Sequence, residues 1–191
     1  AFDVDSLHST RPIEFEVISP DDASAMFDLL TYEKGGAVLR MLEQYVGEDK
    51  FRDGIRSYLK KHEFSNTETS DLWDSIEEFS SIPVRETMNT WIFQPGYPRL
   101  KFKNNEDKIE ISQETFKYDN VDNEFNWKVP VEIVSDESNK KILLENNKLL
   151  TDFDISEFKY GNKNSNGFYR SEYSEEILTN QIFNNLNNLN E

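Results

Sequence analysis

The spacing of apolar residues changes near residues 95–96, and this change limits the folds open to the chain. Before Pro95 the apolar residues recur every three or four positions, which is typical of amphipathic helices. From Tyr97 onward they alternate every second residue, as in strands with one buried face. A helical layer followed by a small set of strands is therefore expected, which is an α+β arrangement.

Four short helices are predicted between residues 31 and 92. The first has Thr31 as its expected N-cap, Tyr32 at its mouth, and an inward face formed by Val38, Leu42 and Tyr45. The second opens at Glu48 and Asp49, the third is capped by Thr69 or Ser70, and the fourth starts at Pro83. The inward positions of these three are Phe51, Ile55, Tyr58 and Leu59; Leu72, Trp73, Ile76 and Phe79; and Val84, Met88, Trp91 and Ile92. Residues 1–24 are expected to be mostly irregular, with a short strand at 13–17.

The second half predicts a small antiparallel β-sandwich of about 75 residues, because six or seven short alternating segments are separated by turn residues. Strict alternation is clearest over residues 125–133. Pro130 is expected to face outward and to mark an edge or a bulge, since proline lacks a backbone N–H. Further strands are expected at 142–144, 153–158 and 168–173. Residues 175–191 return to helical spacing and are interpreted as the first helix of a truncated helical domain.

Two adjacent glycines lie shortly after the helix-mouth tyrosine, although glycine is unfavourable inside a helix. Gly35 and Gly36 should each cost roughly 1 kcal/mol inside a helix relative to alanine. We therefore expect another backbone or a ligand to approach closely at this point. The neighbouring pair Glu33 and Lys34 is interpreted as a solvated face.

Composition excludes several classes of function. A net charge of −16 argues against binding to nucleic acid or to an anionic membrane, both of which favour a basic surface. The acidic surface is interpreted chiefly as a solubility feature, although it could attract a cationic group such as a peptide's ammonium terminus. The sequence has no cysteine, which excludes disulfides, thiolate nucleophiles and cysteine zinc sites and fits a cytoplasmic protein.

No complete catalytic motif is present in the 191 residues. The string that begins at His62 resembles the start of HExxH, but Asn66 stands where the second histidine ligand belongs. His8 is the only other histidine, and no nucleophile elbow or phosphate-binding glycine loop occurs. Tyr32 is therefore the one candidate site residue, and a packing role is the simpler explanation for it.

A series of short motifs nevertheless resembles one enzyme family, the zinc aminopeptidases of the aminopeptidase N family, which include leucyl aminopeptidases and the archaeal tricorn-interacting factors. The resemblance spans essentially the whole chain and rests on the order and spacing of the motifs at 5–7, 11–13, 27–28, 31–35, 38–42, 47–54, 58–62, 71–73, 91–98, 127–131 and 167–170. Arg11 departs from it, since many members have histidine there, and so do Ser171 and Ser174.

The resemblance implies a division into three parts. Residues 1–96 would be the C-terminal helical part of a thermolysin-like catalytic domain, 97–174 the β-sandwich, and 175–191 the first helix of a C-terminal helical domain. Tyr32 would be the tyrosine that stabilises the tetrahedral intermediate while zinc-bound water attacks the peptide carbonyl. Zinc is implied for the full-length parent, whose ligands would lie upstream, so this fragment is expected to bind no zinc and to be inactive alone.

The resemblance also implies partners: peptide substrates with a free N-terminus and an association with a larger protease, with no nucleic acid and no membrane. An alternative from another class is a non-catalytic β-sandwich module that binds a partner, with the helices as scaffold. Two costly glycines beside a helix-mouth tyrosine favour the enzyme over the binding module.

Overall fold

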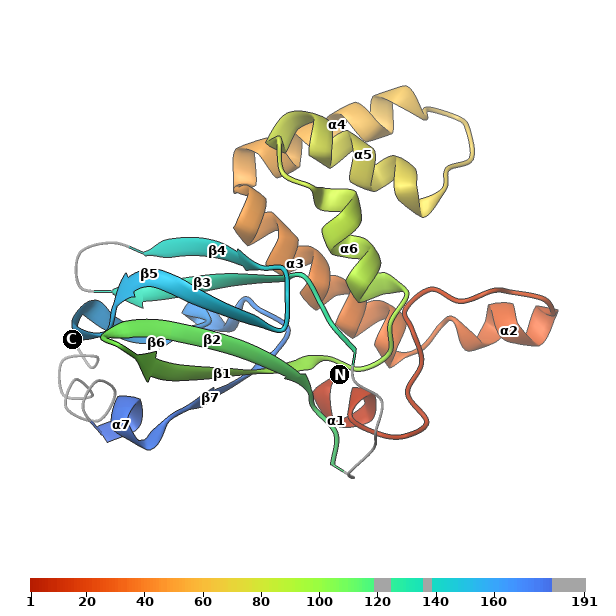
Figure 1. Cartoon of the computed structure of the whole chain (residues 1–191). Coiled ribbons are helices and arrows are strands. Elements are labelled where there is room, and N and C mark those ends of the chain that lie inside the picture. The colour runs from red at the N-terminus through yellow and green to blue at the C-terminus, as the bar shows by residue number, and fades with distance from the viewer. Residues whose placement is uncertain (119–124, 136–138, 180–191) are drawn as a thin grey trace.

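A computed structural model describes residues 1–118, 125–135 and 139–179 of the chain. Helices come first and strands second, as the change of hydrophobic period predicts (Figure 1). The helical elements are α1 (Phe2–Asp5), α2 (Pro20–Ala25), the π-helix η1 (Leu30–Lys34), α3 (Gly35–Val46), α4 (Glu48–Lys61), α5 (Thr69–Ser80) and α6 (Val84–Ile92). The strands and later short helices are β1 (Pro98–Asn105), β2 (Lys108–Thr115), β3 (Val129–Ser135), β4 (Lys140–Leu144), β5 (Lys148–Asp154), η2 (Ile155–Glu157), β6 (Phe158–Gly161), η3 (Lys163–Ser165), β7 (Arg170–Tyr173) and α7 (Glu175–Ile177).

The four predicted helices are α3 to α6, and their inward faces are largely as expected. Val38 and Leu42 in α3 and Trp91 in α6 are fully buried. The prediction is wrong for Leu59 in α4 and for Phe79 in α5, which are both exposed. Leu59 is exposed because α4 is an outer helix that packs mainly against α5. Gly54 permits that packing, since a Cβ atom there would lie only 2.8 Å from the Cα of Ile76.

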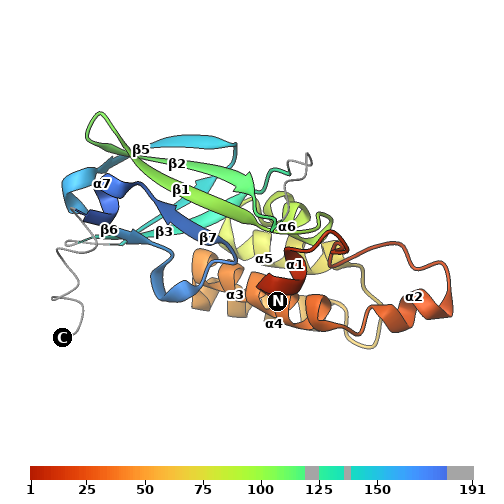
Figure 2. The same cartoon turned by 90° about the horizontal axis from the view of Figure 1, so that it is seen from below.

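The beginning of the chain is more regular than the sequence suggests. Residues 13–17 form no strand, and α2 projects away from the rest of the molecule in both views (Figures 1 and 2). Ser19 caps α2 in a reciprocal capping box with Asp22, and Pro20 takes the first helical position. Pro20 therefore starts a helix instead of only interrupting one.

The strands form two sheets, one with the order β5-β2-β1-β7 and the other with the order β4-β3-β6. The expectation of a purely antiparallel arrangement is wrong at one edge, because β7 pairs in parallel with β1, from Arg99 opposite Arg170 to Phe102 opposite Tyr173. The chain leaves β6 in one sheet and returns to the other through the loop containing η3. β7 therefore begins at the same end of the sheet as β1, and the two strands run in the same direction.

Pro130 does not lie at the outer edge of its sheet, because β3 is flanked by β4 and β6. Its missing N–H is tolerated because β6 pairs only with the far end of β3, from Ile133 to Ser135, and leaves Pro130 with one partner strand. The proline is also buried, since α3 covers this face of the sheet.

One apolar core runs through the helices and both sheets. The rings of Phe102 in β1 and Phe158 in β6 lie 5.8 Å apart, so side chains from the two sheets meet between them. The helix α3 contacts β3 on the other face of the smaller sheet, which gives a helix–sheet–sheet order of layers (Figure 1). No helix in the described ranges combines the length and the apolar character that crossing a bilayer requires.

The last predicted helix begins as expected but lies mostly outside the described residues. Ser174 is its N-cap and accepts a hydrogen bond from the backbone N–H of Ile177, which is fully buried. The apolar positions predicted beyond Thr179, which are Ile182, Leu186 and Leu189, fall in residues 180–191, outside the described part of the chain.

A cross-strand charge cluster on β1 and β2 supplies a pH-dependent contribution to stability. Arg99 lies opposite Glu114, whose carboxylate also accepts a hydrogen bond from Lys101. Burial alone would raise the pKa of Glu114, but the contacts with Lys101 and Arg99 outweigh it and hold this pKa below 4.5. A carboxyl group with a lowered pKa stabilises the fold above its unfolded pKa and loses that contribution as the pH falls.

Glu114→Gln is therefore expected to lower the free energy of unfolding at pH 7 by at most about 1 kcal/mol, because the pair is about a third exposed. Urea denaturation of both proteins at pH 7 and at about pH 3 measures the difference, which should shrink in acid. Glu78→Gln, at an exposed position of α5, is the matched control. A difference that persists unchanged at low pH would contradict the assignment.

Candidate functional site

The candidate tyrosine lies in η1, a single turn of π-helix that leads directly into α3. Turns of this type hold one extra residue relative to an α-helix and are frequent at functional sites. Thr31 is not the N-cap that the sequence predicts. Asp28 has that role: its carboxylate accepts the N–H of Thr31 at 3.0 Å, and its carbonyl accepts the N–H of Tyr32 at 3.2 Å.

Arg11 holds the beginning of this turn from one side. Its guanidinium forms an ion pair with Asp28 at 2.8 Å and donates to the hydroxyl of Thr31 at 3.2 Å. It also donates to the carbonyl of Ala25, at the end of α2. The pKa of Asp28 is held below its ordinary value, because the hydrogen bonds and the charge of Arg11 outweigh the effect of burial. The residue that departs from the family pattern is therefore in direct contact with the candidate turn.

Lys34 holds the other end of the turn. The interpretation of Lys34 as solvated is wrong: its side chain is fully buried, and its Nζ lies 2.9 Å from Oδ2 of Asp5, which is equally buried. Nζ also donates to the carbonyl of Gly96 at 2.9 Å. Burial lowers the pKa of Lys34 below its ordinary value of 10.5, and the charge of Asp5 opposes this shift without cancelling it.

Tyr32 points away from this buried network. Its side chain is 63% exposed, and its nearest aromatic neighbour is Phe27, with ring centroids 6.4 Å apart. Its hydroxyl donates to no atom of the described residues. Tyr32 is thus an exposed phenol on a turn whose two ends are both anchored, and it can offer an O–H group to a ligand.

The glycine pair does not make the close contact that the sequence predicts. A Cβ atom built on Gly35 or Gly36 would meet no described atom within 4 Å, apart from its own helix and chain neighbours. The close backbone approach occurs instead at Gly54. Gly35 and Gly36 therefore leave a stretch of helix surface without side chains just after Tyr32.

The described residues do not offer a site for zinc. No group of three or more His, Cys, Asp or Glu side chains within 1–118, 125–135 and 139–179 is arranged to hold a metal ion. His62 is the C-cap residue of α4, and the sequence after it does not continue the helix that HExxH requires. No step of a reaction can therefore be assigned to a metal bound by these residues.

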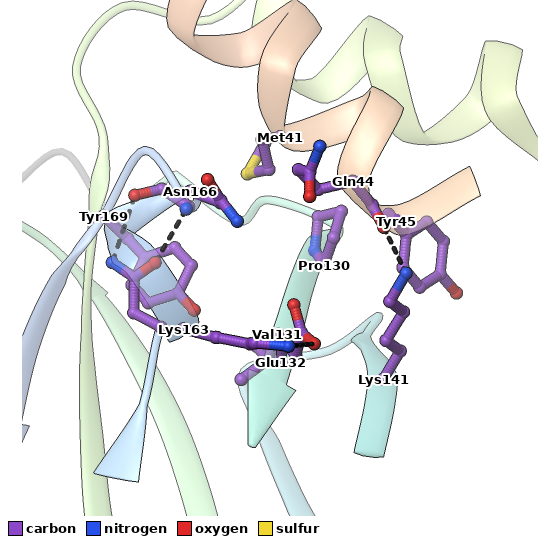
Figure 3. Close-up of a pocket in the computed structure, with 12 residues that line it drawn as sticks. Met41, Gln44, Tyr45, Pro130, Val131, Glu132, Lys141, Lys163, Asn166 and Tyr169 are labelled. Atoms are coloured by element: carbon purple, nitrogen blue, oxygen red, sulfur yellow. Dashed lines mark hydrogen bonds and ion pairs between the residues drawn. The ribbon is translucent and has the colours of Figure 1, made fainter. Parts of the chain in front are cut away.

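A separate pocket lies between α3, β3 and the loop before β7 (Figure 3). It encloses about 290 Å³ of space, some of it open to solvent, between Met41 and Gln44 on the helix and Glu132 and Tyr169 on the other side. Burial raises the pKa of the Tyr169 phenol, and the charge of Glu132 acts in the same direction. Tyr32 does not line this pocket, so the pocket and the candidate site are distinct.

Sequence reasoning missed the buried lysine, although the sequence holds a signal for it. Lys34 lies four residues before Val38 and eight before Leu42, on the same stripe of the helix that the apolar residues follow. A charged residue on an apolar stripe requires a buried partner. That partner, Asp5, is 29 positions away and could not be identified from spacing.

Comparison with known proteins identifies the family. The peptidase family M1 domain matches residues 1–91. The tricorn protease-interacting factor F2 of Thermoplasma volcanium is 39% identical over 178 residues, which are 93% of this chain and 22% of that protein. The leucyl aminopeptidase of Saccharolobus solfataricus is 37% identical over 91% of this chain and 22% of its own length. The glutamyl aminopeptidase of Bos taurus is 36% identical over 88% of this chain and 19% of its own length.

These alignments extend through the strands as well as the helices, and the resemblance in the short motifs is thereby confirmed. The chain spans about a fifth of the length of the curated relatives that it matches. The chain belongs to the peptidase M1 family.

Proposed function

We propose that this chain is part of a zinc-dependent aminopeptidase and that it supplies Tyr32 to the active site. The observation that carries the proposal is the exposed Tyr32 hydroxyl, held on a turn that is anchored at both ends by Arg11 and Lys34. The proposed substrates are peptides with a free N-terminus, as the names of several relatives suggest. An association with a larger protease is proposed by analogy with the tricorn protease-interacting factor F2.

The proposed role of Tyr32 is to donate a hydrogen bond to the oxygen that becomes negatively charged when the peptide carbonyl is attacked. Such a donor stabilises the transition state when it lies about 2.7–3.1 Å from the developing oxyanion. The bare helix surface at Gly35 and Gly36 leaves room beside the phenol for a substrate or for another part of the longer protein. Packing alone does not explain a tyrosine that is 63% exposed.

The proposed organisation follows the family. Residues 1–96 would form the end of a thermolysin-like catalytic domain, 97–174 a β-sandwich, and 175–191 the start of a helical domain. We propose, as the resemblance to zinc aminopeptidases implies, that the zinc which the family requires is held by residues outside this chain. We therefore propose that the 191-residue chain by itself does not hydrolyse peptides.

The test compares wild type and Tyr32→Phe in the full-length protein, with an aminoacyl-anilide as substrate. Loss of one oxyanion donor is expected to lower kcat by about 10²–10³, with zinc content unchanged. Tyr118→Phe is a matched control, since it removes the hydroxyl of another exposed tyrosine. Unchanged turnover in Tyr32→Phe would overturn the proposal and favour the alternative of a non-catalytic binding module.

A further inference from the structure

The buried ion pair between Asp5 and Lys34 is tied to the backbone of a single residue, Gly96, at the junction of helices and strands. Oδ1 of Asp5 accepts the N–H of Gly96 at 3.0 Å, while Nζ of Lys34 donates to the carbonyl of Gly96 at 2.9 Å. The hydroxyl of Thr10 donates to the same Oδ1. Together Asp5 and Lys34 occupy both hydrogen-bonding groups of Gly96, which has a positive φ of 80°.

Stability alone is a weak reason for this arrangement. Removing two charges from water costs more than their mutual attraction often returns, and apolar residues of similar size can replace such pairs with little loss. A buried pair instead fixes the orientation of the elements that it joins, because each of its hydrogen bonds is satisfied in only one geometry.

The part of the molecule whose geometry this pair fixes is η1. Lys34 is the last residue of η1, and Tyr32 is two residues before it. Residues two apart point to roughly opposite sides, because two steps make about half a turn in an α-helix and also in the slightly wider π-turn. The burial of Lys34 against Asp5 therefore turns Tyr32 outward. Rotation or unwinding of η1 would withdraw the ammonium group from both Asp5 and Gly96.

Asp5 is the last residue of the short helix α1. The short helix α1 contacts η1, and both views place it beside the end of α3 that η1 precedes (Figure 2). The residue after Asp5 extends the junction: the hydroxyl of Ser6 lies 2.7 Å from that of Tyr97, to which Arg170 also donates. The turn that carries Tyr32 is thus joined through Asp5 and Ser6 to Gly96 and Tyr97, the residues that lead into β1.

We propose that Asp5 and Lys34 are positioning residues for Tyr32. They touch no substrate; they fix the rotation of η1 relative to Gly96 and so fix the direction in which the phenol points. This inference rests on the proposed function, since it gives the pair a purpose only if Tyr32 acts in the reaction. A donor displaced by about 1 Å can lose up to a hundredfold in rate, so the effect should be visible in kcat.

The experiment is a double-mutant cycle in the full-length protein. Asp5→Asn combined with Lys34→Met removes both charges, keeps an acceptor for Gly96 and Thr10, and fills the volume of the lysine. We expect kcat to fall about tenfold, with KM and zinc content unchanged, because only transition-state stabilisation is affected. In the Tyr32→Phe background the same two substitutions should cause no further loss, because the group that they position is gone.

The outcomes separate the inference from the proposed function. Full activity of Tyr32→Phe would overturn the proposed function and the inference with it. A large loss in Tyr32→Phe with full activity of the Asp5→Asn/Lys34→Met protein would overturn the inference alone. An equal loss in both backgrounds would also overturn it, since a general structural defect is additive.

A second variant covers the case in which the double substitution does not fold. Thr10→Val removes one hydrogen bond from Asp5 and leaves both charges paired. We expect a loss in kcat of about twofold to threefold, corresponding to less than 1 kcal/mol, which again disappears in the Tyr32→Phe background. A loss that survives in that background, or full activity of Thr10→Val, would overturn the inference.

Discussion

Lys34→Met is expected to lower the free energy of unfolding of the chain by about 3–5 kcal/mol, because it leaves the buried carboxylate of Asp5 without its counter-charge. Methionine fills nearly the same volume as lysine, so the loss is electrostatic and does not come from a cavity. The substitution also leaves the carbonyl of Gly96 without the ammonium donor that it has in the wild type.

The measurement is the midpoint of chemical denaturation of the 191-residue chain, followed by circular dichroism. Lys103→Met, at an exposed position of β1, is the matched control and should change stability by no more than about 0.5 kcal/mol. Asp5→Asn/Lys34→Met should lose less than Lys34→Met alone, since no charge remains unpaired. Equal losses in Lys34→Met and Lys103→Met would show that the Asp5–Lys34 pair does not contribute to stability.

Trp91→Ala is expected to lower the free energy of unfolding by about 3–5 kcal/mol, because the indole is fully buried where helices and strands meet. The ring lies 6.2 Å from that of Trp127 and 6.5 Å from that of Phe168, so a cavity here reaches both parts of the core. The indole N–H donates to the carbonyl of Lys128, which would lose this partner.

Thermal and urea unfolding would measure this effect, with Phe93→Ala as the matched control. Phe93 follows α6 directly but is half exposed, so its truncation should cost far less. If helices and strands share one core, Trp91→Ala should lower the midpoint of a single transition. Two separate transitions, with only the helical one shifted, would contradict that expectation.

Periodicity predicted the larger features of the fold because local burial determines them. Val38 and Leu42 on α3, and Leu100 and Phe102 on β1, are buried as their spacing requires. The change from helix to strand was also predictable, since it falls between Ile92 and Pro98, where the apolar period changes. These features depend on a few neighbouring residues and need no knowledge of distant contacts.

The errors concern residues whose environment is set by distant parts of the chain. Lys34 was expected in solvent, and its burial depends on Asp5 in a helix 29 positions away. Pro130 is expected to face outward, and its burial depends on α3. The cap of the first long helix was placed at Thr31 because a π-turn cannot be distinguished from an α-turn by apolar spacing.

The position of Tyr32 at the mouth of a helix is predictable from the sequence, but the surroundings of Tyr32 are not. Tyr32 stands out at the mouth of the first long helix, and the family motif adds its expected role, whereas Arg11 is only a departure from that motif. Its contact with Asp28 and Thr31 depends on the path of residues 11–28, which has no simple periodicity. Exposed aromatic residues such as Phe27 likewise give no signal that spacing could detect.

The parallel pairing of β1 with β7 has a consequence for the order in which the molecule can form. Arg170, the first residue of β7, pairs with Arg99, which lies 71 positions earlier in the chain, and contacts of this range make folding slow. On the ribosome, β1 and β2 can pair early, while the other side of β1 keeps its hydrogen-bonding groups open until Tyr173 has emerged. Until then β1 is an unprotected sheet edge, the kind of surface at which nascent chains associate wrongly. We therefore expect a chaperone that binds nascent chains to be needed most between the synthesis of β1 and that of β7.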